Sequence, residues 1–218
     1  MSDETRKIAV LTGDLVNSTG LGPEKVERAF VALEDCAEMQ AAWMGGQSLH
    51  FTRHRGDGWQ VALAEPKYAL RSALCFRAAL RAISEEYDSY IGIAEGSVEG
   101  KIGPNLNKEQ WEPFINSGDV LEICKSSRTF THFFHAEFDA IGAAFILADA
   151  ISRRWTWKQA ETIFLALIDT GRVTHTEISQ RLQKSRQAVT KSLEGANFPA
   201  ILEALSTLEH NQIEVTNA

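Results

Sequence analysis

The chain has 218 residues and a formal net charge of −7 at pH 7, with 44% hydrophobic and 23% charged residues. These values are ordinary for a folded globular protein, and no proline-rich, glycine-serine or repeated tract indicates disorder. The polar first residues and the lack of an apolar stretch long enough to span a bilayer predict a cytoplasmic protein without membrane contact.

Residues 8–19 read IAVLTGDLVNST and predict a buried strand that ends at a carboxylate. The apolar run is broken by Gly13, and Asp14 follows directly. Pro23 then lies where a helix would begin, and apolar residues at helical spacing continue that helix over residues 23–43.

Residues 55–63 read RGDGWQVAL and predict a tight turn that presents a second carboxylate, Asp57. Expected strands at 48–53 and 58–64 flank the turn. Two carboxylates brought together by a sheet would form a site for a hard divalent cation, which prefers oxygen ligands. The alternative is that each aspartate only shapes its own turn.

The order of the expected elements predicts the fold of this first part. A second amphipathic helix at 68–84 and a strand at 90–98 complete the order strand, helix, strand, strand, helix, strand. That order is typical of a ferredoxin-like α+β unit, with helices on one face of an antiparallel sheet. An apolar stripe between Val120 and Phe145 then predicts one long helix that starts near Gly118 and links two domains.

The C-terminal part predicts a small all-α helix-turn-helix domain. A helix is expected at 157–168, Thr174 with Glu177 forms a capping box for a second helix, and Ser185 can cap a third. Residues 172–191 carry five basic residues and one acidic residue, an excess that a phosphate backbone would attract. We therefore expect domains at 1–152 and 153–218, the second contacting DNA through side chains of the third helix and its cap: Lys184, Ser185, Arg186, Gln187, Thr190 and Lys191. A helical bundle used for protein contact is the alternative.

The two aspartate motifs resemble those of class III nucleotidyl cyclases, in which two such carboxylates bind metal. The strand YIGIAEGSV at 90–98 is similar to the next strand of that family. With the C-terminal helix-turn-helix, the chain resembles the SatD family, in which a cyclase-like domain precedes a DNA-binding module. The resemblance implies that Asp14 and Asp57 hold Mg²⁺ or Mn²⁺. It also implies that backbone amides after Asp14 cradle nucleotide phosphates, at Leu15, Val16, Asn17, Ser18 and Thr19.

The same resemblance assigns roles to a later helix, usually supplied by a dimer partner. Leu121 falls where the family has an asparagine, and Lys125 falls where it has an arginine. Leucine cannot donate a hydrogen bond, and lysine lacks the planar guanidinium. Arg128, one turn further on, could compensate, which makes Lys125 and Arg128 the candidate catalytic residues. Arg53 falls at the position that selects the base.

Three functions fit these residues. The first is a homodimeric DNA-binding transcriptional regulator whose cyclase-like domain binds a nucleotide with a divalent metal. The second is an active nucleotidyl cyclase that makes a cyclic nucleotide from a nucleoside triphosphate. The third is a dimerisation scaffold in which the aspartates form turns only. Because the asparagine and arginine positions are not matched, nucleotide binding is favoured over catalysis.

Overall fold

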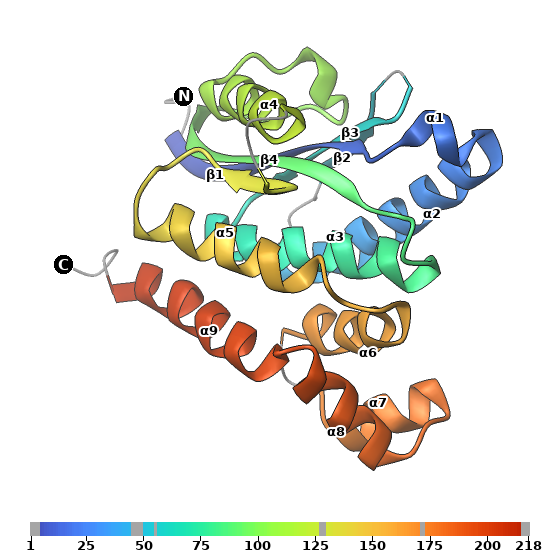
Figure 1. Cartoon of the computed structure of the whole chain (residues 1–218). Coiled ribbons are helices and arrows are strands. Elements are labelled where there is room, and N and C mark those ends of the chain that lie inside the picture. The colour runs from blue at the N-terminus through green and yellow to red at the C-terminus, as the bar shows by residue number, and fades with distance from the viewer. Residues whose placement is uncertain (1–4, 45–49, 55, 127–129, 171–172, 215–218) are drawn as a thin grey trace.

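The computed structural model describes residues 5–44, 50–54, 56–126, 130–170 and 173–214, which form one α+β structure (Figure 1). The strands are β1 (Thr5–Leu15), β2 (His50–Arg53), β3 (Gly58–Leu63), β4 (Ser89–Glu99) and β5 (Phe133–His135). The α-helices are α1 (Ser18–Leu21), α2 (Pro23–Gln40), α3 (Ala69–Ile83), α4 (Glu112–Lys125), α5 (Ala140–Ser152), α6 (Trp157–Ile168), α7 (His175–Leu182), α8 (Arg186–Gly195) and α9 (Phe198–Glu214). Short 3-10 turns lie at Ala41–Met44, Pro66–Tyr68 and Leu106–Lys108.

The sheet has the strand order β2-β3-β1-β4-β5. The first three pairings are antiparallel, as expected from the sequence, whereas β4 and β5 run parallel, with Ile91 opposite Phe133. The prediction of a purely antiparallel sheet was therefore wrong at this edge. The reason is the connection: α4 crosses over between β4 and β5, and a crossover connection returns the chain in the same direction.

Helices cover both faces of the sheet, not one face as the sequence predicted. Helices α2, α3 and α5 lie on one side and α4 on the other (Figure 1). Alternate residues of β1 show the two environments, since Leu11 belongs to the main core while Val10 packs in a second cluster with Phe114 of α4. The sequence did not predict a helix on the second face because the residues of α4 were assigned to a longer helix that links two domains.

The predicted long helix from Gly118 through Phe145 was wrong. Helix α4 ends at Lys125, β5 follows, and α5 starts after Asp139, whose carboxylate accepts hydrogen bonds from the first free amides of the helix. Phe133 and Phe145 are buried, but Phe130 and Phe138 are 90% and 79% exposed. The apolar spacing therefore merged two helices and an edge strand, because a strand of three residues is too short to show its own period.

The C-terminal helices continue the main core below the sheet (Figure 1). Buried residues of α6 such as Ile163 pack in the same cluster as those of α3, and α9 returns to α3 through an ion pair between Arg71 and Glu209. The expected helix at 157–168 and both predicted caps are confirmed, including the Thr174–Glu177 capping box. No described helix is both long enough and apolar enough to cross a membrane.

Candidate functional site

Asp14 is the last residue but one of β1 and directly follows Gly13. It is paired in register with Gly58 of β3 and Tyr90 of β4. The preceding Gly13 lies over the indole of Trp59, and a Cβ on Gly13 would come within 2.1 Å of that ring. The glycine therefore lets a buried tryptophan pack directly under the strand that delivers the carboxylate. The Asp14 carbonyl accepts a hydrogen bond from the Ser89 hydroxyl at 2.9 Å.

Asp57 reaches the same place from the β2–β3 turn. Its carbonyl oxygen accepts a hydrogen bond from the Leu15 amide at 3.2 Å, which ties the turn to the end of β1. Its carboxylate accepts a hydrogen bond from the Ser18 hydroxyl. Partial burial acts to raise the pKa of Asp57, but the Ser18 hydroxyl and Asp14 outweigh it, so the net pKa is lowered. The sheet register thus brings the two predicted carboxylates together.

Lys125 provides the cation of the site. It is the last residue of α4, and its Nζ lies 2.7 Å from a carboxylate oxygen of Asp14 in the same chain. Burial raises the pKa of Asp14, Lys125 acts against this, and the neighbouring Asp57 charge raises it further. The hydrogen bond to Asp14 in turn raises the pKa of Lys125. At neutral pH the three side chains therefore form a partly buried cluster of two acids and one ammonium group.

The segment after Asp14 turns sharply before α2. The amides of Leu15 and Val16 donate to the carbonyls of Asp57 and Asp88, so these two N–H groups are used within the fold. Asn17 adopts a left-handed conformation with φ 53°, and its carbonyl accepts hydrogen bonds from Gly20 and Leu21. Among the predicted nucleotide contacts, Asn17 is the N-cap of α1, and Ser18 and Thr19 are its first two residues, with Ser18 already bonded to Asp57.

The predicted nucleotide contact Arg53 is engaged elsewhere, and Leu121, which falls where the family has an asparagine, is buried. Arg53 pairs with Glu27 of α2 at 2.7 Å, and its guanidinium lies 3.7 Å from the centre of the Phe30 ring. Leu121 is buried where α4 approaches the sheet most closely, since a Cβ on Gly92 would lie 2.3 Å from the Leu121 amide. Arg128, the second candidate catalytic residue, lies outside the described residues.

The sequence did not reveal a buried polar network that lies next to the site. It includes Arg77, and a second series of hydrogen bonds runs through Ser89 to the carbonyl of Asp14. Arg77 of α3 is fully buried and pairs with Asp88 at 3.1 Å and with Asp149 of α5 at 2.7 Å. Trp59 donates its indole N–H to Ser89 at 3.0 Å, and Ser89 in turn binds the carbonyl of Asp14. Charged residues in an otherwise apolar helix were the available signal, because a buried arginine requires acidic partners.

The donor set around Asp14 suits a hard cation only with help from other ligands. Within the described residues, no group of three or more His, Cys, Asp or Glu side chains is placed to hold a metal ion. Two carboxylates are nevertheless a usual protein contribution to Mg²⁺, whose remaining ligands are water and phosphate oxygens. The ammonium of Lys125 now contacts Asp14, so a metal ion would compete with it for that carboxylate.

The second predicted site lies on α7 and α8, the helices farthest from the sheet (Figure 1). Gln183 makes the turn in a left-handed conformation, and the Ser185 hydroxyl caps α8 by accepting from the amide of Ala188. Ile178, Val189 and Leu193 are buried between the helices. The geometry of two short helices joined by a tight turn is therefore present as the caps predicted.

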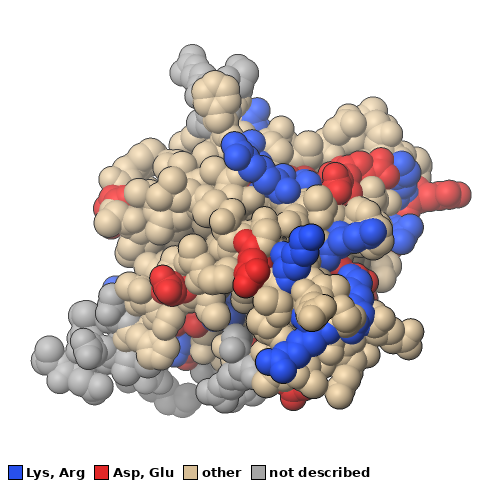
Figure 2. Space-filling model, turned by 60° about the horizontal axis from the view of Figure 1, so that its bottom comes forward, with Lys and Arg blue, Asp and Glu red and all other residues tan. Residues whose placement is uncertain are grey.

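The outer face of α8 carries most of the predicted DNA contacts. Arg186, Gln187 and Lys191 are exposed, and together with Thr190 and Glu194 they line a shallow hollow. Figure 2 shows Lys and Arg side chains gathered on the face that comes forward from the bottom of Figure 1. Lys184 is instead paired with Glu161 of α6 at 2.5 Å, and Thr190 is hydrogen-bonded to His175 at 2.9 Å.

The solved structures that resemble this chain include three of nucleotidyl cyclases. The guanylyl cyclase Cya2 shares 22% sequence identity over 56% of this chain and 73% of its own, with a TM-score of 0.41. Two structures of a bacterial light-regulated adenylyl cyclase share 14% and 15% identity, with TM-scores of 0.44 and 0.43. They cover 62% and 61% of this chain, which spans 44% and 76% of their lengths. Neither a family model nor a curated protein sequence matches the chain.

Proposed function

We propose that the protein is a DNA-binding regulator in which residues 1–152 bind a nucleotide with Mg²⁺ or Mn²⁺ and thereby change how residues 153–218 bind DNA. The observation that carries this proposal is the cluster of Asp14, Asp57 and Lys125 at one end of β1. Two carboxylates beside one ammonium group match a ligand that has both a divalent cation and phosphate oxygens.

Each residue of the cluster has a definite part in that binding. Asp57, with its lowered pKa, stays ionised and offers a carboxylate at neutral pH. Asp14 exchanges its contact with Lys125 for the metal, and Lys125 then pairs with a phosphate group. Asn17, Ser18 and Thr19 line the approach from the turn. When bound, the metal would supply positive charge that neutralises the phosphates.

A continuous series of contacts connects this cluster to α8 and supports the proposed regulation. The Val16 amide donates to the carbonyl of Asp88 at 2.9 Å, and the Asp88 carboxylate lies 3.8 Å from Arg81. Arg81 donates to the carbonyl of Trp155 at 2.9 Å. The Trp155 indole donates to the carbonyl of Ala196, the C-cap of α8, at 3.0 Å. We therefore expect a shift of the turn after Asp14 to reach α8 through these contacts.

The first experiment measures nucleotide binding by calorimetry, with Mn²⁺ and each of the four nucleoside triphosphates. We expect saturable binding of at least one nucleotide, its loss in Asp14→Asn, and no change in the control Asp119→Asn, an exposed acid on α4. Lys125→Met separates the parts of the site: it should bind Mn²⁺ alone more tightly and the nucleotide more weakly. No binding of any nucleotide by the folded protein would contradict the proposal and leave the scaffold.

The second experiment measures binding to a mixed-sequence DNA duplex as a function of salt. Arg186→Ala with Lys191→Ala should weaken binding and reduce the slope of log K against log[salt] by about 0.9 for each phosphate contact removed. Arg154→Ala, an exposed basic residue outside α8, is the matched control. In Arg81→Met, nucleotide and DNA should each still bind, but the nucleotide should no longer alter DNA affinity. Unchanged DNA binding in the α8 double variant would remove the DNA-binding proposal.

An active cyclase is the alternative, and the position of Lys125 favours it because an ammonium group there can neutralise charge on a phosphate. Against catalysis, Leu121 is buried and has no polar atom to orient a ribose. Mass spectrometry of reactions with Mn²⁺ and each triphosphate tests this directly. A cyclic nucleotide that is absent with Asp14→Asn/Asp57→Asn would establish the cyclase, whereas intact triphosphates support the regulator.

A second copy of the chain is the proposed partner of the apolar surface near α5. Phe130, Phe138 and Leu147 are 90%, 79% and 65% exposed, which is unusual for large apolar side chains. A dimer that covers these side chains would also supply two α8 helices, as a two-fold DNA site requires. Light scattering should give a dimer for the natural chain and a monomer for Phe138→Ser/Leu147→Gln.

A further inference from the structure

A second pocket lies at the opposite end of β1 from Asp14. It has a volume of about 260 Å³ and is lined by Arg6, His50 and Lys101, with Ile8, Ala62 and Ile102 among its apolar residues. Arg6 and Asp14 are eight residues apart on one strand, which corresponds to about 27 Å. The pocket is therefore separate from the aspartate site.

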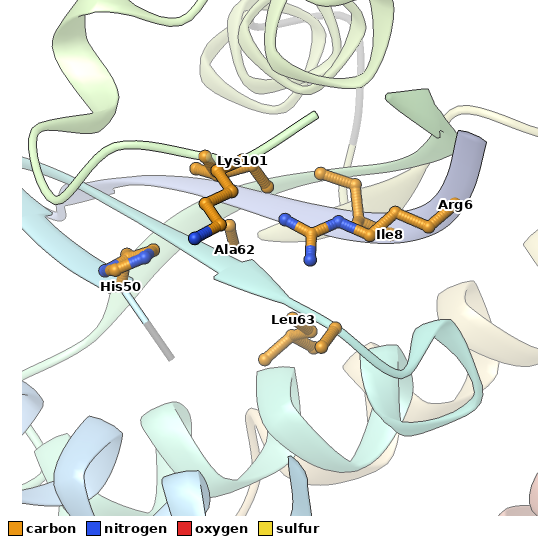
Figure 3. A pocket seen from close by; sticks show the side chains of 8 residues that line it. Arg6, Ile8, His50, Ala62, Leu63 and Lys101 are labelled. Atoms are coloured by element: carbon orange, nitrogen blue, oxygen red, sulfur yellow. The ribbon is translucent and has the colours of Figure 1, made fainter. Parts of the chain in front are cut away.

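Three nitrogen-bearing side chains meet in this pocket from three different segments. Arg6 comes from β1, His50 from β2 and Lys101 from the segment after β4. Figure 3 shows the side chains over the sheet, with Lys101 between Arg6 and His50 and its ammonium directed to the side of His50. No Asp or Glu is among the described residues that line the pocket. The convergence therefore produces a local positive charge without an internal counter-ion.

One nitrogen of the half-buried Arg6 side chain also lacks a hydrogen-bond partner. Its Nε is buried and makes no hydrogen bond within the described part of the chain. Across that same part, none of the ion pairs includes Arg6 or Lys101. A buried donor without an acceptor is unfavourable, and a bound anion would supply that acceptor.

The residue types indicate which anion fits. The planar guanidinium of arginine matches two phosphate oxygens at once, and lysine adds a point charge on the same group. The volume is below the range of about 300–1,000 Å³ that is usual for drug-sized ligands, which favours a ligand smaller than a nucleoside triphosphate. The apolar residues can contact a short carbon chain.

We propose that this pocket binds the phosphate group of a small phosphomonoester. Arg6 and Lys101 bind the phosphate oxygens, His50 completes the polar lining, and Ile8, Ala62 and Ile102 contact the ester carbon atoms. The site lies on the face of the sheet that α4 covers, because Ile8 belongs to the same apolar cluster as Phe114 of α4.

The test is calorimetric titration with glycerol 3-phosphate and with inorganic phosphate, at constant ionic strength set by sodium chloride. We expect saturable binding of both, the ester being the tighter, and an affinity at least tenfold weaker in Arg6→Gln and in Lys101→Gln. Lys108→Gln is the matched control, because Lys108 is an exposed lysine outside the pocket. Lys101 is itself exposed, so its substitution tests the site without disturbing the core.

Three outcomes would overturn the assignment. The first is the lack of saturable binding of either probe by the natural chain. The second is equal binding by the natural chain and both pocket variants, which would place the phosphate elsewhere. The third is loss of binding in Lys125→Met, which would place it at the aspartate pair. Inorganic phosphate binding without the ester would refute the phosphomonoester as ligand.

Discussion

Removal of one charge from the buried network under the site should strongly destabilise the protein. The change is Asp149→Asn, which keeps the side-chain volume but leaves the buried guanidinium of Arg77 with Asp88 as its remaining acidic partner. The side chains of Arg77 and Asp149 are both 0% exposed, and Nη1 lies 2.7 Å from the carboxylate oxygen. Their attraction is therefore little screened by water.

The expected loss follows from this geometry. Removal of one member of a buried ion pair costs about 3–5 kcal/mol, because the other charge remains buried without its counter-ion. Since Asp88 stays with Arg77 and the asparagine oxygen can still accept from the amides of His132 or Phe133, the lower limit of about 3 kcal/mol applies. That is a large fraction of the total of about 5–15 kcal/mol typical of folded proteins.

Equilibrium urea unfolding, followed by the fluorescence of the buried Trp59 and Trp155, measures this loss. Asp35→Asn, an exposed acid on α2, is the control and should change the free energy of unfolding by less than about 0.5 kcal/mol. A double-mutant cycle with Arg77→Met should give a coupling energy of about 1–3 kcal/mol. A cost below about 1 kcal/mol for Asp149→Asn would refute the reasoning, since the ion pair would then not offset its own desolvation.

Three further predictions follow from the packing. Burial acts to raise the pKa of the Asp88 carboxyl, but Arg77 and His132 hold that pKa well below its usual range. The contribution of Asp88 to stability is therefore complete above the unfolded-state pKa of about 3.9, and it is lost as pH falls below that value. Urea unfolding between pH 7 and pH 3 should show this loss, and Asp88→Asn should remove part of the pH dependence. Gly92→Ala would place a Cβ 2.1 Å from the Ser117 carbonyl oxygen and push α4 from the sheet. Thermal unfolding should show a loss of about 1–3 kcal/mol in the free energy of unfolding. Gly118 has open space around it, so Gly118→Ala should instead raise that free energy by up to about 1 kcal/mol. Burial raises the pKa of Cys36 to about 12 and that of Cys75 well above its usual value. A thiol reagent at pH 8 should therefore modify these two residues only as fast as the protein unfolds. Fast labelling of the native protein would contradict their buried positions.

The sequence by itself determined the local features of this protein. Neighbouring residues predict the strand that contains Asp14, the turn at Asp57 and the capping box at Thr174. They do so because turns and caps depend on contacts over three or four positions. The pairing of β1 with β3 was also predictable in outline, since alternating apolar residues select the buried face. These features supported the hypothesis that the two carboxylates meet, beside the alternative that each aspartate only shapes its own turn.

The tertiary structure determined which charged side chains lie next to the two carboxylates. Lys125 reaches Asp14 across 111 positions of the chain because α4 packs on the outer face of the sheet, and the local spacing around Lys125 had instead predicted a longer helix. The Arg77 network and the pocket at Arg6 likewise join residues from separate elements. Such contacts leave no periodic signal in the sequence, because the distance between two charges is set by how sheets and helices pack and not by how residues follow one another.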